Sequence, residues 1–154
     1  MALGQASGKI NQVDLSRLRD KICLLETRHL KGIKKSAAKS HKHAVGKCQI
    51  LVATAQDVWK EGVEWGYLPP WVLQYVESEK AVEALLQIDE ISEGTSLSYL
   101  RWMVEHGRPL NVKYLAYYYN AGPNSPYGRS GEGFRFAEEV YRLYLPPTPS
   151  PKKG

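Results

Sequence analysis

Residues 14–29 read DLSRLRDKICLLETRH, and the pattern in this stretch decides how the rest of the sequence is interpreted. Its apolar residues recur at spacings of three and four, at Leu15, Leu18, Ile22 and Leu25. This spacing predicts an amphipathic helix with one face toward the core, and Asp14 is a favourable N-cap for it. Glu26 follows Ile22 by four residues, so we expect its carboxyl group at the end of the apolar face, where a charge is normally avoided.

The composition is that of one globular domain. Of the 154 residues, 43% are hydrophobic and 24% are charged, a balance that supports a real core. Lysine and arginine outnumber aspartate and glutamate by 21 to 16, and the net charge of +5 favours acidic polymers such as nucleic acid or the bacterial envelope as partners. Four Trp and ten Tyr against two Phe suit wet grooves and sugar rings, although we expect most of these side chains in the core.

The chain divides into a central domain and two short ends. Residues 1–13 show no apolar period and are predicted to form a flexible segment, and residues 145–154 form a Pro-rich tail. Residues 14–144 contain no repeat and no break in composition, so we expect a single domain. Because the N-terminus lacks the apolar stretch of a secretory signal, we expect synthesis in the cytoplasm without a signal peptide, and we expect no membrane span.

Apolar periodicity predicts further helices at residues 54–66, 96–106, 111–122 and 134–144, with a helix-like stretch at 71–93. Gly94 is the predicted stop of that stretch, and the predicted N-caps of later helices are Ser96 and Asn111. Long loops are expected at 30–47 and 122–133. The predicted fold class is therefore mainly α, with five to seven helices and at most a minor β element.

Glu26 is the first candidate for chemistry. Burial of a carboxyl group on an apolar face disfavours its charged form and raises its pKa, which is the property of a general acid near neutral pH. The alternative is a structural glutamate that reaches solvent or pairs with Arg28. Periodicity alone does not choose between the two.

Three motifs, in order, resemble the lytic transglycosylases of the soluble-transglycosylase type, which are lysozyme-like. Residues 25–29, LETRH, look like the family's helix end, where the catalytic Glu is followed by Ser or Thr. Residues 40–49, SHKHAVGKCQ, follow the family's Ser-x-x-Gly-Ala-x-Gly-Leu-Met-Gln element. Residues 116–123, AYYYNAGP, are similar to its Ala-Tyr-Asn-Ala-Gly-Pro element. The resemblance spans residues 14–144 and implies a small helical domain with a substrate groove.

The second motif also departs from the family pattern. His43 stands where the family has Gly, Lys47 where it has Leu and Cys48 where it has Met, which puts the shape and polarity of this loop in doubt. In the last helix, Ala137 stands where a Glu is common. The position of the acid is not affected by these changes.

The resemblance implies that Glu26 is the single catalytic acid and base. It would protonate the glycosidic oxygen between N-acetylmuramic acid and N-acetylglucosamine, and then take the proton from the muramoyl C6 hydroxyl as a 1,6-anhydro ring closes. The implied substrate-binding residues are Thr27, Ser40, Gln49, Tyr119 and Asn120. The implied partner is the glycan strand of peptidoglycan, and no cofactor or metal is implied.

Other functions remain open at this stage. A muramidase would hydrolyse the same bond and needs a second carboxylate, for which Asp89, Glu90 or Glu132 are candidates. A catalytically inactive peptidoglycan-binding module would bind glycan strands in the same groove without cleaving them. Specific nucleic-acid binding is disfavoured, because there is no recognised motif and the basic stretch at 31–47 has no interleaved aromatic residues.

The histidines and cysteines allow a second hypothesis. A zinc site would draw on His29, His41, His43 and Cys48, but their spacing matches no standard ligand pattern, and solvated histidines are the favoured interpretation. Cys23 and Cys48 are expected to be reduced, buried thiols, which approach each other only if the turn at Gly46 folds beside the first helix.

A wall-cleaving enzyme of this size without a signal peptide is typical of bacteriophages. We expect it to act on the cell wall as a virion-associated or lysis protein. A component of a secretion or conjugation apparatus is the alternative, and other proteins of such an apparatus would then be partners.

Overall fold

The computed structural model describes residues 13–28, 44–128 and 131–146. The elements follow one another as helix α1 (Leu15–Thr27), strands β2 (Ala44–Val45) and β3 (Ile50–Leu51), helix α2 (Val52–Glu64), 3-10 helix η3 (Pro70–Tyr75), and helices α3 (Glu79–Leu85), α4 (Asp89–Glu105), α5 (Val112–Ala121) and α6 (Gly131–Tyr144). The prediction of a mainly α fold with a minor β element is confirmed. The β element is an antiparallel pair in which Val45 lies opposite Ile50.

Helix α1 forms as the sequence predicts. The side chain of Asp14 accepts a hydrogen bond from the backbone N–H of Arg17 at 3.1 Å, which satisfies a donor of the first turn. Leu18 and Ile22 are fully buried, so the apolar face does lie in the core. The helix ends at Thr27, two residues before the predicted end at His29, which lies outside the described residues.

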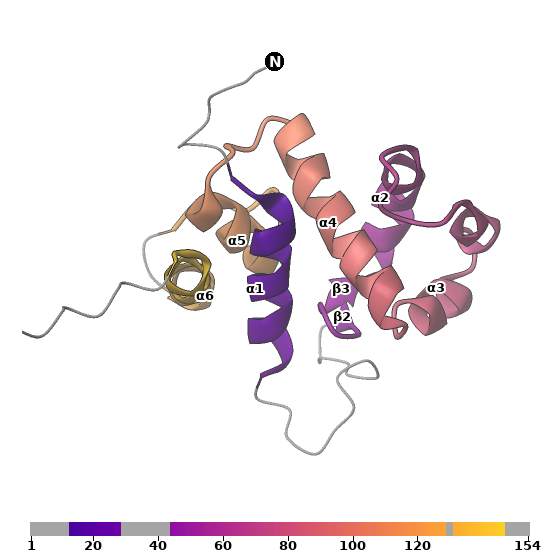
Figure 1. Cartoon of the computed structure of the whole chain (residues 1–154), viewed down its shortest axis with the longest axis horizontal. Helices are drawn as coiled ribbons and strands as arrows, with labels where there is room; N and C mark the ends of the chain where they lie inside the picture. Colours follow the sequence, from indigo (N-terminus) through magenta and orange to yellow (C-terminus); the bar gives the residue numbers. More distant parts are fainter. Residues whose placement is uncertain (1–12, 29–43, 129–130, 147–154) are drawn as a thin grey trace, which may run out of the picture.

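Helix α4 is the central element of the fold. Figure 1 shows it between α1 on one side and α2 and α3 on the other. Every residue from Gly94 to Leu100 is buried, because neighbours cover this part of the helix on all sides. This position explains why its polar residues turn inward: the Thr95 hydroxyl accepts from the indole N–H of Trp59 at 2.8 Å and donates to the carbonyl oxygen of Ile91 at 2.6 Å.

The predicted boundary at Gly94 and Ser96 is wrong, since α4 continues through both residues. A Cβ atom at Gly94 would lie 2.4 Å from the carbonyl oxygen of Tyr67, so glycine is needed here for close packing rather than to end the helix. Ser96 is fully buried and is not a cap. The helix-like stretch 71–93 accordingly divides into η3, α3 and the beginning of α4.

Two other boundaries also differ from the prediction. Helix α2 begins at Val52, two residues before the predicted start at Thr54. Helix α6 begins at Gly131 and not at Phe134. By contrast, Asn111 caps α5 as predicted, and its side chain accepts from the N–H of Tyr114 at 3.0 Å. The start of α2 has no side-chain cap in the structure, so the sequence carries no cap signal that would place it.

Helices α5 and α6 pack together beside α1. In Figure 1, α6 is seen nearly end-on next to α1, so the two helices cross steeply. Hydrogen bonds hold them together in two places. The N–H of Asp14 donates to the hydroxyl of Tyr144 at 2.9 Å, and the guanidinium of Arg28 donates to both carboxylate oxygens of Glu139 at 2.7 Å.

Cys23 and Cys48 form a disulfide, with their Cα atoms 4.2 Å apart. The prediction of burial is confirmed, since the residues are 2% and 0% exposed, but the prediction of reduced thiols is wrong. The turn at residues 46–49 folds beside α1, the condition under which the sequence allowed the two residues to meet. Sequence spacing could not show that this condition holds, because it depends on tertiary packing.

Some predictions lie outside the described residues. These are the flexible segment at 1–12, most of the loop at 30–47, and the tail from 147 onward. Among the helices that the structure describes, none has the length and apolar character needed to cross a membrane.

Candidate active site

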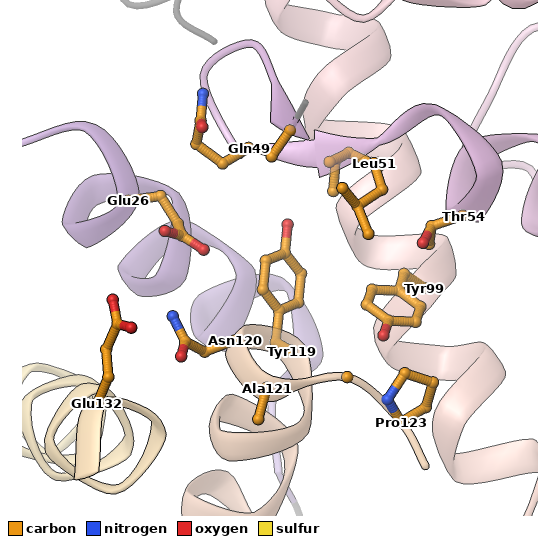
Figure 2. Close-up of a pocket in the computed structure, with 13 residues that line it drawn as sticks. Glu26, Gln49, Leu51, Thr54, Tyr99, Tyr119, Asn120, Ala121, Pro123 and Glu132 are labelled. Atoms are coloured by element: carbon orange, nitrogen blue, oxygen red, sulfur yellow. The ribbon is translucent and has the colours of Figure 1, made fainter. Parts of the chain in front are cut away.

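A cleft of about 330 Å³ opens where α1, α4, α5 and the two-stranded sheet meet. Its size is within the range of small-molecule sites. Its lining comes from the end of α1, the sheet, the start of α2, the middle of α4, the end of α5 and the first turn of α6: Glu26, Ala44, Gln49, Ile50, Leu51, Thr54, Tyr99, Tyr119, Asn120, Ala121, Gly122, Pro123 and Glu132. Residues far apart in the sequence are therefore brought to one hollow (Figure 2).

Glu26 lies in the last turn of α1 and is half-buried. Its neighbours on both sides, Leu25 and Thr27, are buried, so the carboxyl group stands at the edge of the core. In Figure 2 it points into the cleft toward Asn120 and Glu132. The end of the apolar stripe thus opens into the cleft, and a group here can exchange a proton with a bound molecule.

Tyr119 also lines the cleft. Its side chain is buried, and its hydroxyl donates to the carbonyl oxygen of Cys48 at 2.8 Å. Burial raises the pKa of this phenol well above its usual value, and the nearby negative charge of Glu26 adds to the effect. Tyr119 therefore stays a neutral donor that ties α5 to the 46–49 turn.

The next residue along α5, Asn120, is half-buried, and Figure 2 shows its amide beside the carboxyl groups of Glu26 and Glu132. Gln49 also lines the cleft, with a left-handed φ of 50°. Its amide N–H donates to the carbonyl oxygen of Gly46 at 2.9 Å. Asn120 thus presents its amide to the cleft, whereas the amide nitrogen of Gln49 is used within its own turn.

Thr27, another predicted binding residue, does not line the cleft. Thr27 is 1% exposed, and its hydroxyl contacts the carbonyl oxygens of Cys23 and Lys47 at 3.4 and 3.5 Å. It therefore joins α1 to the turn instead of facing a ligand. Ser40 lies outside the described residues.

Sequence reasoning did not single out several residues of the lining. Tyr99 is the clearest case: its ring centroid lies 5.4 Å from that of Tyr119, and burial raises its pKa to about 12. No sequence signal could have found it, because α4 is buried all round in this region and has no single apolar face. Leu51 at the end of β3 and Thr54 in the first turn of α2 also line the cleft.

The muramidase hypothesis named three possible second carboxylates. Only Glu132 lines the cleft, while Asp89 and Glu90 do not. Tyr117 and Tyr118 are buried in the core, as expected, and are absent from the lining.

The zinc hypothesis rested mainly on His29, His41 and His43, which are not among the described residues. Its fourth member, Cys48, is bonded to Cys23 and so is not a thiolate. Within residues 13–28, 44–128 and 131–146, no group of three or more His, Cys, Asp or Glu side chains is placed to hold a metal ion.

In comparisons with protein-family models, curated proteins and solved structures, no match to this chain was found. The site must therefore be interpreted from its own residues.

Proposed function

We propose that this protein is a peptidoglycan lytic transglycosylase with a lysozyme-like domain and Glu26 as its catalytic acid and base. One observation carries the proposal. The carboxyl group of Glu26 is half-buried and projects into a cleft, beside Asn120 from the AYYYNAGP element that resembles the family's motif.

The chemistry needs one carboxyl group at this position. Protonated Glu26 gives its proton to the glycosidic oxygen, so that the bond from the muramoyl C1 atom breaks and the N-acetylglucosamine chain leaves as an alcohol. The sugar's acetamido group stabilises the positive centre at C1. The Glu26 carboxylate then takes the proton of the C6 hydroxyl group, while the oxygen of that hydroxyl group forms a bond to C1 and closes the 1,6-anhydro ring. No water is consumed, and Glu26 regains its proton.

The lining of the cleft suits an N-acetylated sugar. Leu51, Tyr99 and Pro123 supply apolar surface for a sugar face or a methyl group. Asn120 supplies an amide that can both donate and accept hydrogen bonds. The net charge of +5 favours approach to the anionic bacterial wall. We infer that the protein acts there on glycan strands, as a virion-associated or lysis protein of a phage.

Digestion of purified sacculi tests the proposal. The wild type should release fragments with anhydro ends, which mass spectrometry identifies because they are lighter by one water than fragments with reducing ends. Glu26→Gln should abolish release but still sediment with sacculi. Glu90→Gln is a matched control, since Glu90 is exposed and does not line the cleft. Fragments with reducing ends alone would exclude the transglycosylase mechanism.

A hydrolytic muramidase is the second candidate, and one observation favours it. Glu132 supplies the cleft with the second carboxyl group that a hydrolase uses to activate water. The same digestion separates the two enzymes by the end group. A binding module without turnover would sediment with sacculi and release nothing, whether or not Glu26 is replaced.

A further inference from the structure

Glu132 lies on the first turn of α6 and lines the cleft across from α1. Figure 2 shows its carboxyl group pointing toward that of Glu26, with the amide of Asn120 next to both. The resemblance to known enzymes assigns no role to this residue. The two carboxyl groups come from opposite ends of the chain and meet only through the fold.

Packing of α6 fixes the position of Glu132. The neighbouring Gly133 sits directly on α5, and a Cβ atom there would lie 2.9 Å from the ring of Tyr117 and 3.4 Å from the Cβ atom of Ala121. The absence of a side chain thus lets the first turn of α6 approach the end of α5. Further along α6, the Arg28 to Glu139 ion pair holds the helix to the end of α1. These contacts hold α6 against the end of α5 that carries Asn120 and against the end of α1 that carries Glu26. The position of Glu132 relative to both residues is therefore fixed.

The charged side chains that line the cleft are all acidic among the described residues. Its lining residues include two acidic side chains, Glu26 and Glu132, and no Lys, Arg or His among the residues that the structure describes. Glu26 becomes negative only as it gives up its proton, so a carboxylate at Glu132 adds a second negative charge to this lining while the positive charge at C1 develops. Fixed charges aimed at the place where the opposite charge develops are a large source of catalysis.

We infer that Glu132 is a second functional carboxylate, which stabilises the positive charge that develops at C1 of the sugar while Glu26 transfers the protons. This inference rests on the proposed function and deepens it, because it describes the substrate as one whose reacting centre becomes cationic. Glu132 forms no covalent bond and transfers no proton, so the atoms balance as before.

Replacement of Glu132 with Gln tests the inference, because it keeps the shape of the side chain and removes its charge. We expect kcat on glycan strands to fall by about 10²-fold, the scale found when one electrostatic partner of a transition state is removed, with little change in KM. Glu132→Asp, which restores the charge, should recover part of the rate. The matched control is Glu138→Gln on the same helix, which breaks an exposed ion pair with Lys113 outside the cleft.

The outcomes separate this inference from the proposed function. If the wild type releases anhydro ends and Glu132→Gln is as active as Glu138→Gln, the inference fails and the proposed function stands. If the wild type releases only reducing ends and Glu132→Gln abolishes release, Glu132 is a hydrolytic base and both fail. Urea unfolding of each variant shows whether a lost rate has its origin in a lost fold.

Discussion

Removal of the disulfide between Cys23 and Cys48 should destabilise the protein strongly. The bond joins α1, three residues before Glu26, to the turn that carries Gln49. Two perturbations remove it: the double substitution Cys23→Ala/Cys48→Ala, and reduction of the wild type. Because both residues are buried, reduction requires unfolding in the presence of a thiol, followed by refolding.

The size of the effect follows from the length of chain between the two cysteines. The sequence separation is 25. A cross-link of this span lowers the entropy of the unfolded chain and so stabilises the folded protein by about 3.5 kcal/mol at 25 °C. For a protein of this length that corresponds to a fall in Tm of roughly 7–14 °C. The alanine variant also leaves a small cavity, so it should lose a further amount of roughly 1 kcal/mol.

Urea unfolding of the oxidised wild type, the reduced wild type and the alanine variant measures these differences. Thiol labelling after denaturation should find no free thiol in the oxidised protein and two in the reduced protein. The alanine variant is the control, since a reductant should not move its midpoint. Reduction should also slow glycan cleavage, because the 46–49 turn borders the cleft.

Two results would refute this reasoning. Two free thiols in the protein as purified under oxidising conditions would show that the bond does not form. Equal unfolding midpoints for the oxidised and reduced wild type would show that the bond forms without restricting the unfolded chain.

Three further predictions concern packing and the buried phenols. Gly94→Ala should destabilise the fold by about 2 kcal/mol or more in urea unfolding, although alanine is the better helix former, because its Cβ would lie 2.4 Å from the carbonyl oxygen of Tyr67. Raising the pH from 10 to 12 should cost roughly 2 kcal/mol of stability, seen as a falling Tm. Burial raises the pKa of Tyr99 to about 12 in the folded state, so the unfolded chain loses its proton first and gains stability as the pH rises. Tyr119→Phe should cost about 1 kcal/mol in thermal unfolding, because its buried hydrogen bond to Cys48 is lost.

Matched variants serve as controls for these predictions. Glu90→Ala places alanine at an exposed position of the same helix as Gly94 and should leave stability nearly unchanged. Tyr99→Phe should reduce the loss of stability between pH 10 and pH 12. Tyr75→Phe, at a residue that is 42% exposed, should leave that loss unchanged. A Gly94→Ala protein as stable as the wild type would contradict the packing argument. An alkaline loss unchanged by Tyr99→Phe would assign that loss to other groups.

Local patterns predicted what depends on neighbours in the sequence. The apolar stripe of α1, its Asp14 cap and the Asn111 cap of α5 were all predicted, because a helix repeats every 3.6 residues and a cap acts within one turn. The same stripe placed Glu26 at the edge of the core. The AYYYNAGP element, the third motif in order along the chain, also identified the segment that contributes Tyr119 and Asn120 to the cleft.

Tertiary packing decided what depends on residues distant in the sequence. It carried α4 through Gly94, because the backbone at Tyr67 lies against that glycine. It also turned Thr27 into the core and joined Cys23 to Cys48. None of these has a local signal.

The sequence by itself determined a helical domain and the one acidic residue that ends its first apolar stripe. Only the tertiary structure decided that a cleft opens at that residue, that Tyr99 lines it and that Glu132 faces Glu26 across it. The physical reason is that periodicity reports which side of a helix is buried. It does not report which other helix covers that side, or which side chains that helix brings.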